Sequence, residues 1–279
     1  MITTGIPEGS LASRYDALLC DLDGVVYAGP DAVPGAVEAL STAIAAGMPV
    51  GFVTNNASRP AQAVAEHLRG LGIDTDAAHV FGSARAGAQL AALDAARRGV
   101  EHPTALVVGA QILREEAEAA GFVLVESTDE AVADYVLQGF DPGLGWVDLA
   151  RAAYTIQRGA VWVATNTDST IPRAPGLAPG NGSLVAAVRA AVDVEPLVAG
   201  KPAPALMELA ARELGATNPL MIGDRLDTDI AGGVAAGFDT ALVLTGVNTR
   251  EDAARADASE RPTHILESLT ALLEQAASA

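Results

Sequence analysis

Cysteine, histidine, basic residues and long apolar runs are all scarce in this chain of 279 residues. Cys20 is the only cysteine, so no internal disulfide can form, and its apolar surroundings favour a buried filler over a nucleophile. The four histidines are widely spaced, which disfavours a zinc site. No apolar run reaches the roughly 18–20 residues of a membrane helix, and the first residues lack the pattern of a signal peptide. We therefore expect a soluble, cytoplasmic protein.

Basic residues are half as frequent as acidic ones, with 17 against 35, which gives a net charge of −18. A field of this sign repels nucleic acid and anionic membrane surfaces, so neither is an expected partner. It also repels an anionic substrate at long range, so a phosphate site would need positive charge close by. Half of the residues are hydrophobic and 19% are charged, which predicts a folded protein with a sizeable core.

Helix and strand signals alternate along almost the whole chain, which predicts an α/β fold with a mostly parallel sheet. Residues 1–84 and 190–279 share one pattern and are expected to form a doubly wound core. Residues 85–189 are expected to form a smaller α/β domain inserted between the two halves. Three prolines and three glycines predict a loop over 171–182, and a helix is expected over 266–276.

The apolar run Leu18–Cys20 leads directly into Asp21, Leu22, Asp23 and Gly24. Side chains two residues apart on an extended strand point the same way, so we expect both carboxylates on one side. Gly24 permits a sharp turn that brings backbone N–H groups close to a ligand. Two neighbouring carboxylates indicate a metal site, an anion-transfer site or both, and an ordinary acidic turn is the alternative.

Three further groups of polar residues follow apolar runs, at the strand ends where open parallel sheets bind their ligands. The hydroxyl and turn amides of the first group can hold phosphate oxygens, although a simple polar turn is the alternative. A carboxylate directly after an apolar strand is a good ligand for a hard cation. Asp224 is such a carboxylate, and Asp229, five residues later, suits either the same cation site or the first turn of a helix. The residues are Thr54 and Asn55, then Lys201, then Asp224 and Asp229.

The order of these groups resembles the four motifs of the haloacid dehalogenase-like superfamily of phosphotransferases. The forms Asp-Leu-Asp-Gly-Val, Thr-Asn-Asn and Gly-Lys-Pro, with a long insertion before the third, resemble its NagD-type branch. Residues 179–184 and 223–229 look closest to its phosphoglycolate, pyridoxal phosphate and p-nitrophenyl phosphatases. The resemblance implies a Rossmann-like core with an inserted cap domain and a phosphatase that acts through an aspartyl-phosphate.

The resemblance also implies a role for each motif residue. Asp21 would be the nucleophile, and Asp23 would protonate the leaving oxygen and later deprotonate the attacking water. Lys201 would balance the charge of Asp21 and of the phosphoryl oxygens. The implied phosphate-binding groups are Gly24, Thr54, Asn55 and Lys201, and the implied Mg²⁺ ligands are Asp21, the Asp23 carbonyl and Asp224, supported by Asp229.

Small phosphate monoesters are the implied substrates, with glycerol 3-phosphate and phosphoglycolate favoured over pyridoxal phosphate and nucleotides. The cap loop over 166–183, with Asn166, Asp168 and Arg173, is the expected substrate-selecting surface. A homodimer stays open. The alternatives are a non-enzymatic phospho-acceptor module of the receiver type, which has no need of Asp23 or of a cap, and a phosphomutase. The first strand is not followed by Gly-x-Gly-x-x-Gly, which disfavours a dinucleotide-binding enzyme.

Overall fold

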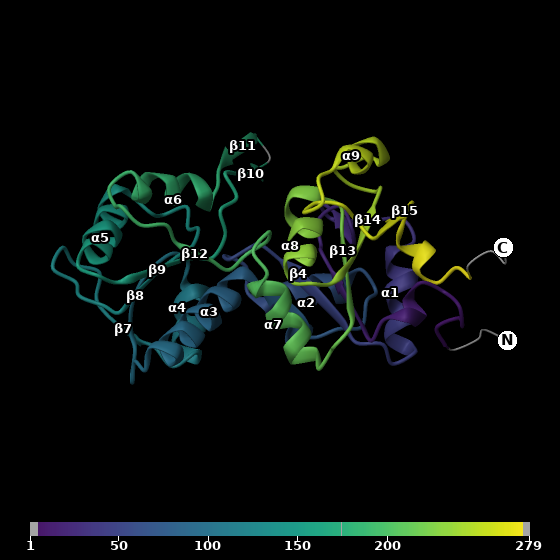
Figure 1. Cartoon of the computed structure of the whole chain (residues 1–279), viewed down its shortest axis with the longest axis horizontal. Helices are drawn as coiled ribbons and strands as arrows, with labels where there is room; N and C mark the ends of the chain where they lie inside the picture. Colours follow the sequence, from purple (N-terminus) through teal and green to yellow (C-terminus); the bar gives the residue numbers. More distant parts are fainter. Residues whose placement is uncertain (1–4, 174, 276–279) are drawn as a thin grey trace. The chain divides into compact units, whose positions relative to one another are not determined.

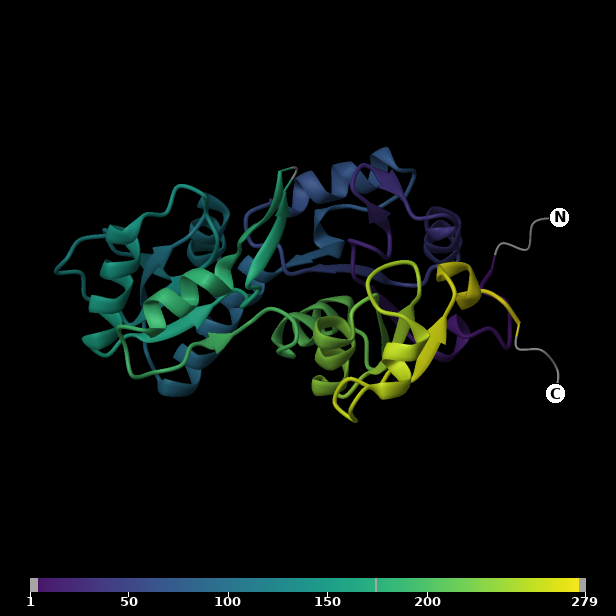
Figure 2. The ribbon, with the colours of Figure 1, turned by 90° about the horizontal axis from the view of Figure 1, so that it is seen from above.

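A computed structural model of the protein describes residues 5–173 and 175–275, which form two compact α/β units. Unit 1 contains the residues up to Thr54, then Ala61–Phe81, then the residues from Lys201 onward. Unit 2 contains Asn55–Pro60 and Gly82–Gly200. In Figures 1 and 2 the purple N-terminal and yellow C-terminal segments accordingly lie in the same unit, whereas the teal middle of the chain forms the other.

Unit 1 is built on a six-stranded sheet in which β1 lies between β13 and β4 and pairs with both in parallel. The chain adds β4 and β5 on one side of β1, and β13, β14 and β15 on the other. This reversal places the topological switch point beside β1, where sheets of this kind bind ligands. The strand order is β15 (His264–Leu266), β14 (Asp239–Val243), β13 (Pro219–Gly223), β1 (Ala17–Cys20), β4 (Val50–Thr54) and β5 (Val80–Gly82).

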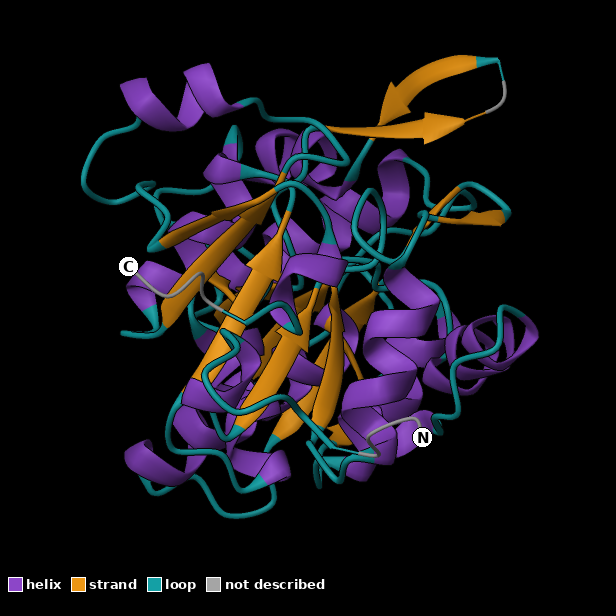
Figure 3. Cartoon of the chain, turned by 90° about the vertical axis from the view of Figure 1, so that its right-hand side faces the viewer, coloured by secondary structure: helices purple, strands orange, loops and turns teal. Residues whose placement is uncertain are grey.

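Helices cover both faces of this sheet, which explains why its central strands are buried apolar runs rather than alternating ones (Figure 3). Cys20 and Phe52 face α1 (Ala36–Ala45) and α2 (Ala61–Gly70). Side chains alternate along a strand, so Leu19 faces the opposite layer, which includes α7 (Ala205–Leu214) and α8 (Ala231–Ala235).

Unit 2 has its own five-stranded parallel sheet with a hydrophobic cluster on each face. One face packs against α3 (Ser83–Arg98) and α4 (Gln111–Ala119), and the other against α5 (Trp146–Gln157) and α6 (Asn181–Arg189). The strand order is β12 (Leu197–Val198), β9 (Val161–Ala164), β8 (Tyr135–Gln138), β6 (Thr104–Val108) and β7 (Val123–Leu124).

The remaining elements are short. In the described part of the chain they include two antiparallel hairpins, β2 (Tyr27–Ala28) with β3 (Asp31–Ala32) and β10 (Thr170–Arg173) with β11 (Gly176–Pro179). The others are the short helix α9 (Arg250–Arg255) and the helical turns η1 (Ala12–Arg14), η2 (Ala77–His79), η3 (Leu226–Ile230) and η4 (Leu269–Leu272). None of the helices within 5–173 and 175–275 has the length and apolarity that a bilayer span requires.

The α/β, doubly wound fold predicted from the sequence is confirmed, but several local predictions are wrong. The stretch 171–182, expected as a loop, contains most of the β10–β11 hairpin, because its prolines stand at positions that this isolated two-stranded pairing tolerates. The helix expected over 266–276 is absent from 266–275, which contain the end of β15 and the short η4, since His264–Leu266 pairs with β14; residue 276 lies outside the described residues. Residues 190–200, expected in the core, group with unit 2, because β12 pairs with β9.

Candidate active site

Two neighbouring strands deliver the first carboxylates. Asp21 follows the last residue of β1, and its N–H donates to the Ile222 carbonyl at 2.9 Å. Asp224 follows the last residue of the adjacent β13. Both side chains are buried, and one carboxylate oxygen of each lies within 4.8 Å of an oxygen of Asp229. The parallel pairing therefore gathers at one edge three acids that the sequence separates by up to 208 residues.

Asp229 reaches this cluster from η3, a single wide helical turn that directly follows the loop after β13. Its Oδ2 accepts a hydrogen bond from the Arg225 N–H at 3.1 Å, which fixes the carboxylate at the strand end. A Cβ at position 223 would overlap the Asp229 side chain, so only glycine fits there. The Arg225 side chain itself points to Asp227 at 2.7 Å, in an exposed ion pair.

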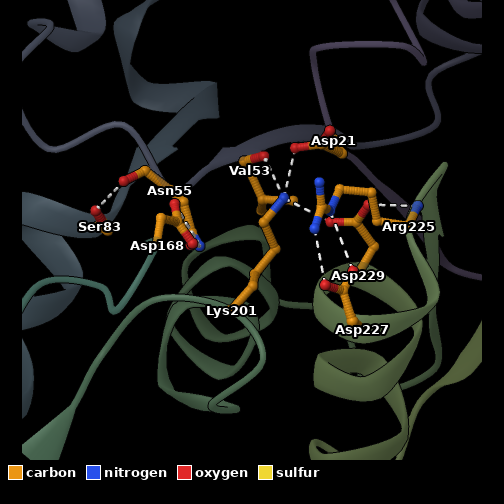
Figure 4. Close-up of polar contacts among 9 residues, drawn as sticks. All are labelled: Asp21, Val53, Asn55, Ser83, Asp168, Lys201, Arg225, Asp227 and Asp229. Carbon is orange, nitrogen blue, oxygen red and sulfur yellow. Dashed lines mark hydrogen bonds and ion pairs between the residues drawn. The ribbon is translucent and has the colours of Figure 1, made fainter. Parts of the chain in front are cut away.

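Lys201 is the only lysine of the chain, and it lies inside the acidic cluster (Figure 4). Its ammonium is 2.5 Å from Asp21 Oδ1 and 2.7 Å from Asp229 Oδ1, and it donates to the Val53 carbonyl at 3.5 Å. The side chain is 4% exposed. Because this ammonium is buried between two carboxylates, solvent screens its charge only weakly. It therefore supplies the local positive charge that a phosphate site in so acidic a protein needs.

The pKa of Asp21 is raised to about 8 and that of Asp224 to about 6, mainly by burial and secondly by the charge of Asp229, while Lys201 opposes both increases. Burial alone would lower the pKa of Lys201, but Asp21 and Asp229 raise it above its ordinary value. When all three carboxylates are ionised, as metal ligands must be, they and the Lys201 ammonium leave two negative charges in the cluster. One divalent cation would neutralise them.

The donor set fits such a cation. Asp224 Oδ2 accepts a hydrogen bond from the Val247 N–H at 2.8 Å, whereas its Oδ1 is buried and has no hydrogen-bond partner within the described part of the chain. Carboxylate oxygens are the preferred ligands of hard cations such as Mg²⁺ and Ca²⁺. A cation would therefore satisfy an atom that is otherwise costly to bury.

Asp23 and Gly24 lie in a tight turn after β1. A turn at Gly24 was expected, but Asp23 does not continue the extended strand that would put its side chain on the same side as that of Asp21. The Leu22 carbonyl accepts the N–H groups of residues 25 to 27, so the chain reverses at once. Asp21 is consequently buried and Asp23 is exposed. Gly24 has a φ of +80°, and a Cβ there would lie 2.6 Å from Asp224 Oδ2. The glycine is therefore required by its backbone conformation and by the close approach of Asp224.

Thr54 is the buried last residue of β4, the other neighbour of β1. The next residue, Asn55, belongs to unit 2 and is held there by side chains from several segments. Its Nδ2 donates to both oxygens of Asp168, at 3.1 and 3.3 Å, and its carbonyl accepts from Ser83 Oγ at 2.6 Å and from Asn166 Nδ2 at 2.8 Å. Figure 4 shows Asn55 with Ser83 and Asp168.

Two of the three expected substrate-selecting residues thus meet at Asn55. Asn166 is buried, and its side chain also accepts from the Asp168 N–H, so both of its polar groups are bonded inside unit 2. Arg173 is exposed on β10, with its guanidinium 5.9 Å from the centre of the Phe140 ring. The charged side chain of Arg173 is therefore available for contacts at the surface, whereas the buried side chain of Asn166 is already engaged in hydrogen bonds.

Sequence reasoning missed the turn after β14 and the buried Ser83. Thr245 Oγ1 donates to the Gly24 carbonyl at 2.7 Å, and the Asn248 side chain accepts from the Leu226 N–H at 2.9 Å. A signal was present, because this turn is another polar group at the end of an apolar strand. Ser83 carries no such signal, since it begins the alanine-rich α3 and does not follow a long apolar run.

Comparisons with known proteins bear on this geometry. A family model described as haloacid dehalogenase-like hydrolase matches residues 18–123, and a HAD-hydrolase-like model matches residues 198–272. D-glycerol 3-phosphate phosphatase of Mycobacterium tuberculosis is 46% identical over 265 residues, which cover 94% of this chain and 72% of that protein. This chain belongs to the haloacid dehalogenase-like hydrolases.

Similarity to other members of the family supports the same assignment. The 5'-nucleotidase YutF of Bacillus subtilis is 37% identical, over 92% of this chain and 96% of that protein. A crystal structure of the M. tuberculosis glycerol phosphate phosphatase in complex with magnesium is 44% identical and superposes with a TM-score of 0.88, over 96% of this chain and 79% of that one. The matches confirm the NagD-type branch predicted from the motifs, and the chain is a phosphatase of this hydrolase family.

Proposed function

We propose that this hydrolase cleaves small phosphate monoesters, with glycerol 3-phosphate or phosphoglycolate favoured, by transferring the phosphoryl group to Asp21. One observation carries the proposal: a buried ammonium, that of Lys201, lies 2.5 Å from Asp21 at the switch point of the sheet. Glycerol 3-phosphate gains support from the 46% identical relative that is named for this substrate.

In the first step, a carboxylate oxygen of Asp21 forms a bond to phosphorus while the bond from phosphorus to the leaving oxygen breaks. Asp23 donates its proton to that oxygen, so the alcohol departs neutral. A carboxylate about 4 Å from an anionic phosphate oxygen is repelled by about 4 kcal/mol per charge pair at an effective dielectric of 20. Lys201 offsets this repulsion because its ammonium already contacts the nucleophile.

Mg²⁺, the cofactor of this phosphatase, supplies positive charge to the phosphoryl oxygens when it is bound. We assign it to Asp21, Asp224 and the Asp23 carbonyl. Asp224 Oδ1 is the buried acceptor that it would satisfy. Asp229 supports the site by holding Lys201.

Phosphate oxygens would be held by the Thr54 hydroxyl, the Asn55 backbone N–H and the turn at Gly24. Thr54 ends β4 beside β1, and the Asn55 N–H lies on the peptide that follows it. In the second step, Asp23 takes a proton from water while the water oxygen attacks phosphorus. The bond from phosphorus to Asp21 then breaks, which releases phosphate and restores the carboxylate.

We further propose that unit 2 serves as the cap and selects the alcohol part of the ester. Arg173 is exposed on the β10–β11 hairpin, and Asp168 is tied to Asn55, which continues from Thr54. A cap favours small soluble esters, and the charge of −18 opposes nucleic acid as a substrate. A cytoplasmic location and a homodimer remain predictions.

Phosphate release from a panel of esters tests the proposal. The panel contains both enantiomers of glycerol 3-phosphate, phosphoglycolate, pyridoxal phosphate, nucleoside monophosphates and p-nitrophenyl phosphate, each with Mg²⁺ and with excess chelator. We expect Mg²⁺-dependent release that is highest for glycerol 3-phosphate or phosphoglycolate. The Asp21→Asn variant should release none while its circular dichroism stays unchanged, because an amide does not attack phosphorus.

Two outcomes would replace the proposal by its alternatives. Stable phosphorylation of Asp21 without phosphate release would indicate a phospho-acceptor module. Conversion of an ester into its isomer without phosphate release would indicate a phosphomutase.

A further inference from the structure

The turn after β14, residues 245–248, packs against Asp224 and forms two backbone hydrogen bonds with it. The Val247 N–H donates to Asp224 Oδ2 at 2.8 Å, and the Asn248 N–H donates to the Asp224 carbonyl at 3.1 Å. Backbone groups of one turn thus hold both the main chain and one carboxylate oxygen of this acid. The orientation of the carboxylate is therefore set by a segment 21 or more residues away in the sequence.

Side chains of the same turn join the loops that follow β1 and β13. Thr245 Oγ1 donates to the Gly24 carbonyl at 2.7 Å, on the loop that carries Asp21. Asn248 Oδ1 accepts at 2.9 Å from the N–H of Leu226, the first residue of η3, which directly follows the loop that carries Asp224. The turn is therefore bonded to both acid-bearing loops, all within unit 1.

Two glycines pack against the Asp224 carboxylate. A Cβ on Gly246 would overlap Asp224 Oδ2 and lie 2.5 Å from its Cγ. A Cβ on Gly24 would lie 2.6 Å from the same oxygen, and 3.3 Å from the Gly246 Cα. Because Oδ2 is enclosed by two backbone segments and bonded to an N–H, the carboxylate has little room to turn.

The other oxygen, Oδ1, is buried and lacks a hydrogen-bond partner among the described residues. We propose that the 245–248 turn restricts Asp224 to binding a cation through Oδ1 alone, and thereby makes the site prefer Mg²⁺ over Ca²⁺. The inference rests on the metal site of the proposed function.

The preference follows from the coordination of the two cations. Mg²⁺ takes six ligands at about 2.0–2.1 Å in nearly regular octahedral geometry, which single carboxylate oxygens provide. Ca²⁺ takes six to eight ligands at about 2.3–2.6 Å and often binds both oxygens of a carboxylate. A carboxylate whose second oxygen is already bonded denies Ca²⁺ that extra ligand.

Gly246→Ala tests the proposal, with Gly70→Ala as its matched control. The same methyl group at Gly70, the last residue of α2, meets nothing within 4 Å. Binding of Mg²⁺ and of Ca²⁺ is measured by titration calorimetry without substrate, and folding by thermal unfolding. We expect Gly246→Ala to weaken Mg²⁺ binding at least about tenfold and Ca²⁺ binding much less, because displaced supporting groups typically cost 10- to 100-fold in metal affinity. Gly70→Ala should leave both affinities unchanged.

Two milder variants at Thr245 test the same proposal in case Gly246→Ala does not fold. Thr245→Val removes the hydrogen bond to the Gly24 carbonyl with little change of volume, and should lower the ratio of Mg²⁺ to Ca²⁺ affinity. Thr245→Ser keeps the hydroxyl and should restore the ratio, which a merely space-filling role would not do.

Two results would overturn the proposal. One is an unchanged ratio of the two affinities in both Gly246→Ala and Thr245→Val. The other is an equal loss for both metals, since the turn would then support the site without selecting the cation. If the wild-type protein bound no Mg²⁺ at all, the metal site of the proposed function would fail as well, so the two failures are distinguishable.

Discussion

Replacing Lys201 by Met removes the only positive charge found inside the acidic cluster of the described structure. The ammonium is 2.5 Å from Asp21 and 2.7 Å from Asp229, whose side chains are 13% and 1% exposed. Methionine has a similar length and carries no charge. In metal-free protein, the variant would leave buried carboxylates facing one another without compensation.

The size of the effect follows from these distances. Two carboxylates within 4.8 Å of each other repel by about 3–4 kcal/mol at an effective dielectric of 20. Removing one partner of a buried ion pair typically costs about 3–5 kcal/mol, which agrees. For a protein of this size, such a loss lowers the unfolding temperature by roughly 6–20 °C.

Differential scanning calorimetry in chelator at about pH 9, above the raised pKa of Asp21, measures this loss. Lys201→Met should also abolish phosphate release, because the repulsion between Asp21 and the phosphate returns. The loss of stability should shrink at pH 5, where the carboxylates take up protons. The double variant Lys201→Met with Asp229→Asn should recover most of the stability and none of the activity.

Arg250→Met is the matched control, because Arg250 forms an ion pair with Glu267 at 2.6 Å whose side chains are 55% and 78% exposed. Exposed pairs contribute only about 0–1 kcal/mol. If Lys201→Met unfolded within 2 °C of the wild type, or lost no more stability than Arg250→Met, the buried ammonium would not hold the cluster together and our reasoning would be refuted.

Three further predictions concern single groups. Asp23→Asn should cost much more activity on glycerol 3-phosphate than on p-nitrophenyl phosphate, whose leaving group needs little protonation; equal losses would contradict the acid role. Folding favours the protonated form of Asp224, because burial raises its pKa to about 6. In chelator, the unfolding temperature of wild type should therefore fall relative to that of Asp224→Asn as the pH rises from 4 to 7, and a constant gap would contradict the raised pKa. Arg173→Ala should change the ranking of alkyl esters and leave p-nitrophenyl phosphate turnover nearly unchanged; a parallel loss on every ester would exclude a selecting role.

The sequence alone determined the kind of fold and the identity of the main polar groups. Apolar runs such as Leu18–Cys20 and Leu220–Ile222 are local features, and an aspartate follows each of them within two residues. Because parallel strands end at the same edge of a sheet, this local pattern was enough to place Asp21 and Asp224 together. The reaction class, phosphate ester hydrolysis, came from the resemblance of the motifs to a known family.

Tertiary structure alone decided which groups meet at atomic distance. Asp21 and Asp23 are equivalent by spacing, but the turn after β1 buries the first and exposes the second. The bond from Thr245 to Gly24 joins residues 221 positions apart, and no local pattern encodes such a contact. The β10–β11 hairpin and the C-terminal β15 were mispredicted for the same reason, because strand pairing overrode the local preference of their residues. Local sequence sets where a strand ends, whereas the packing of distant segments sets what its last residue touches.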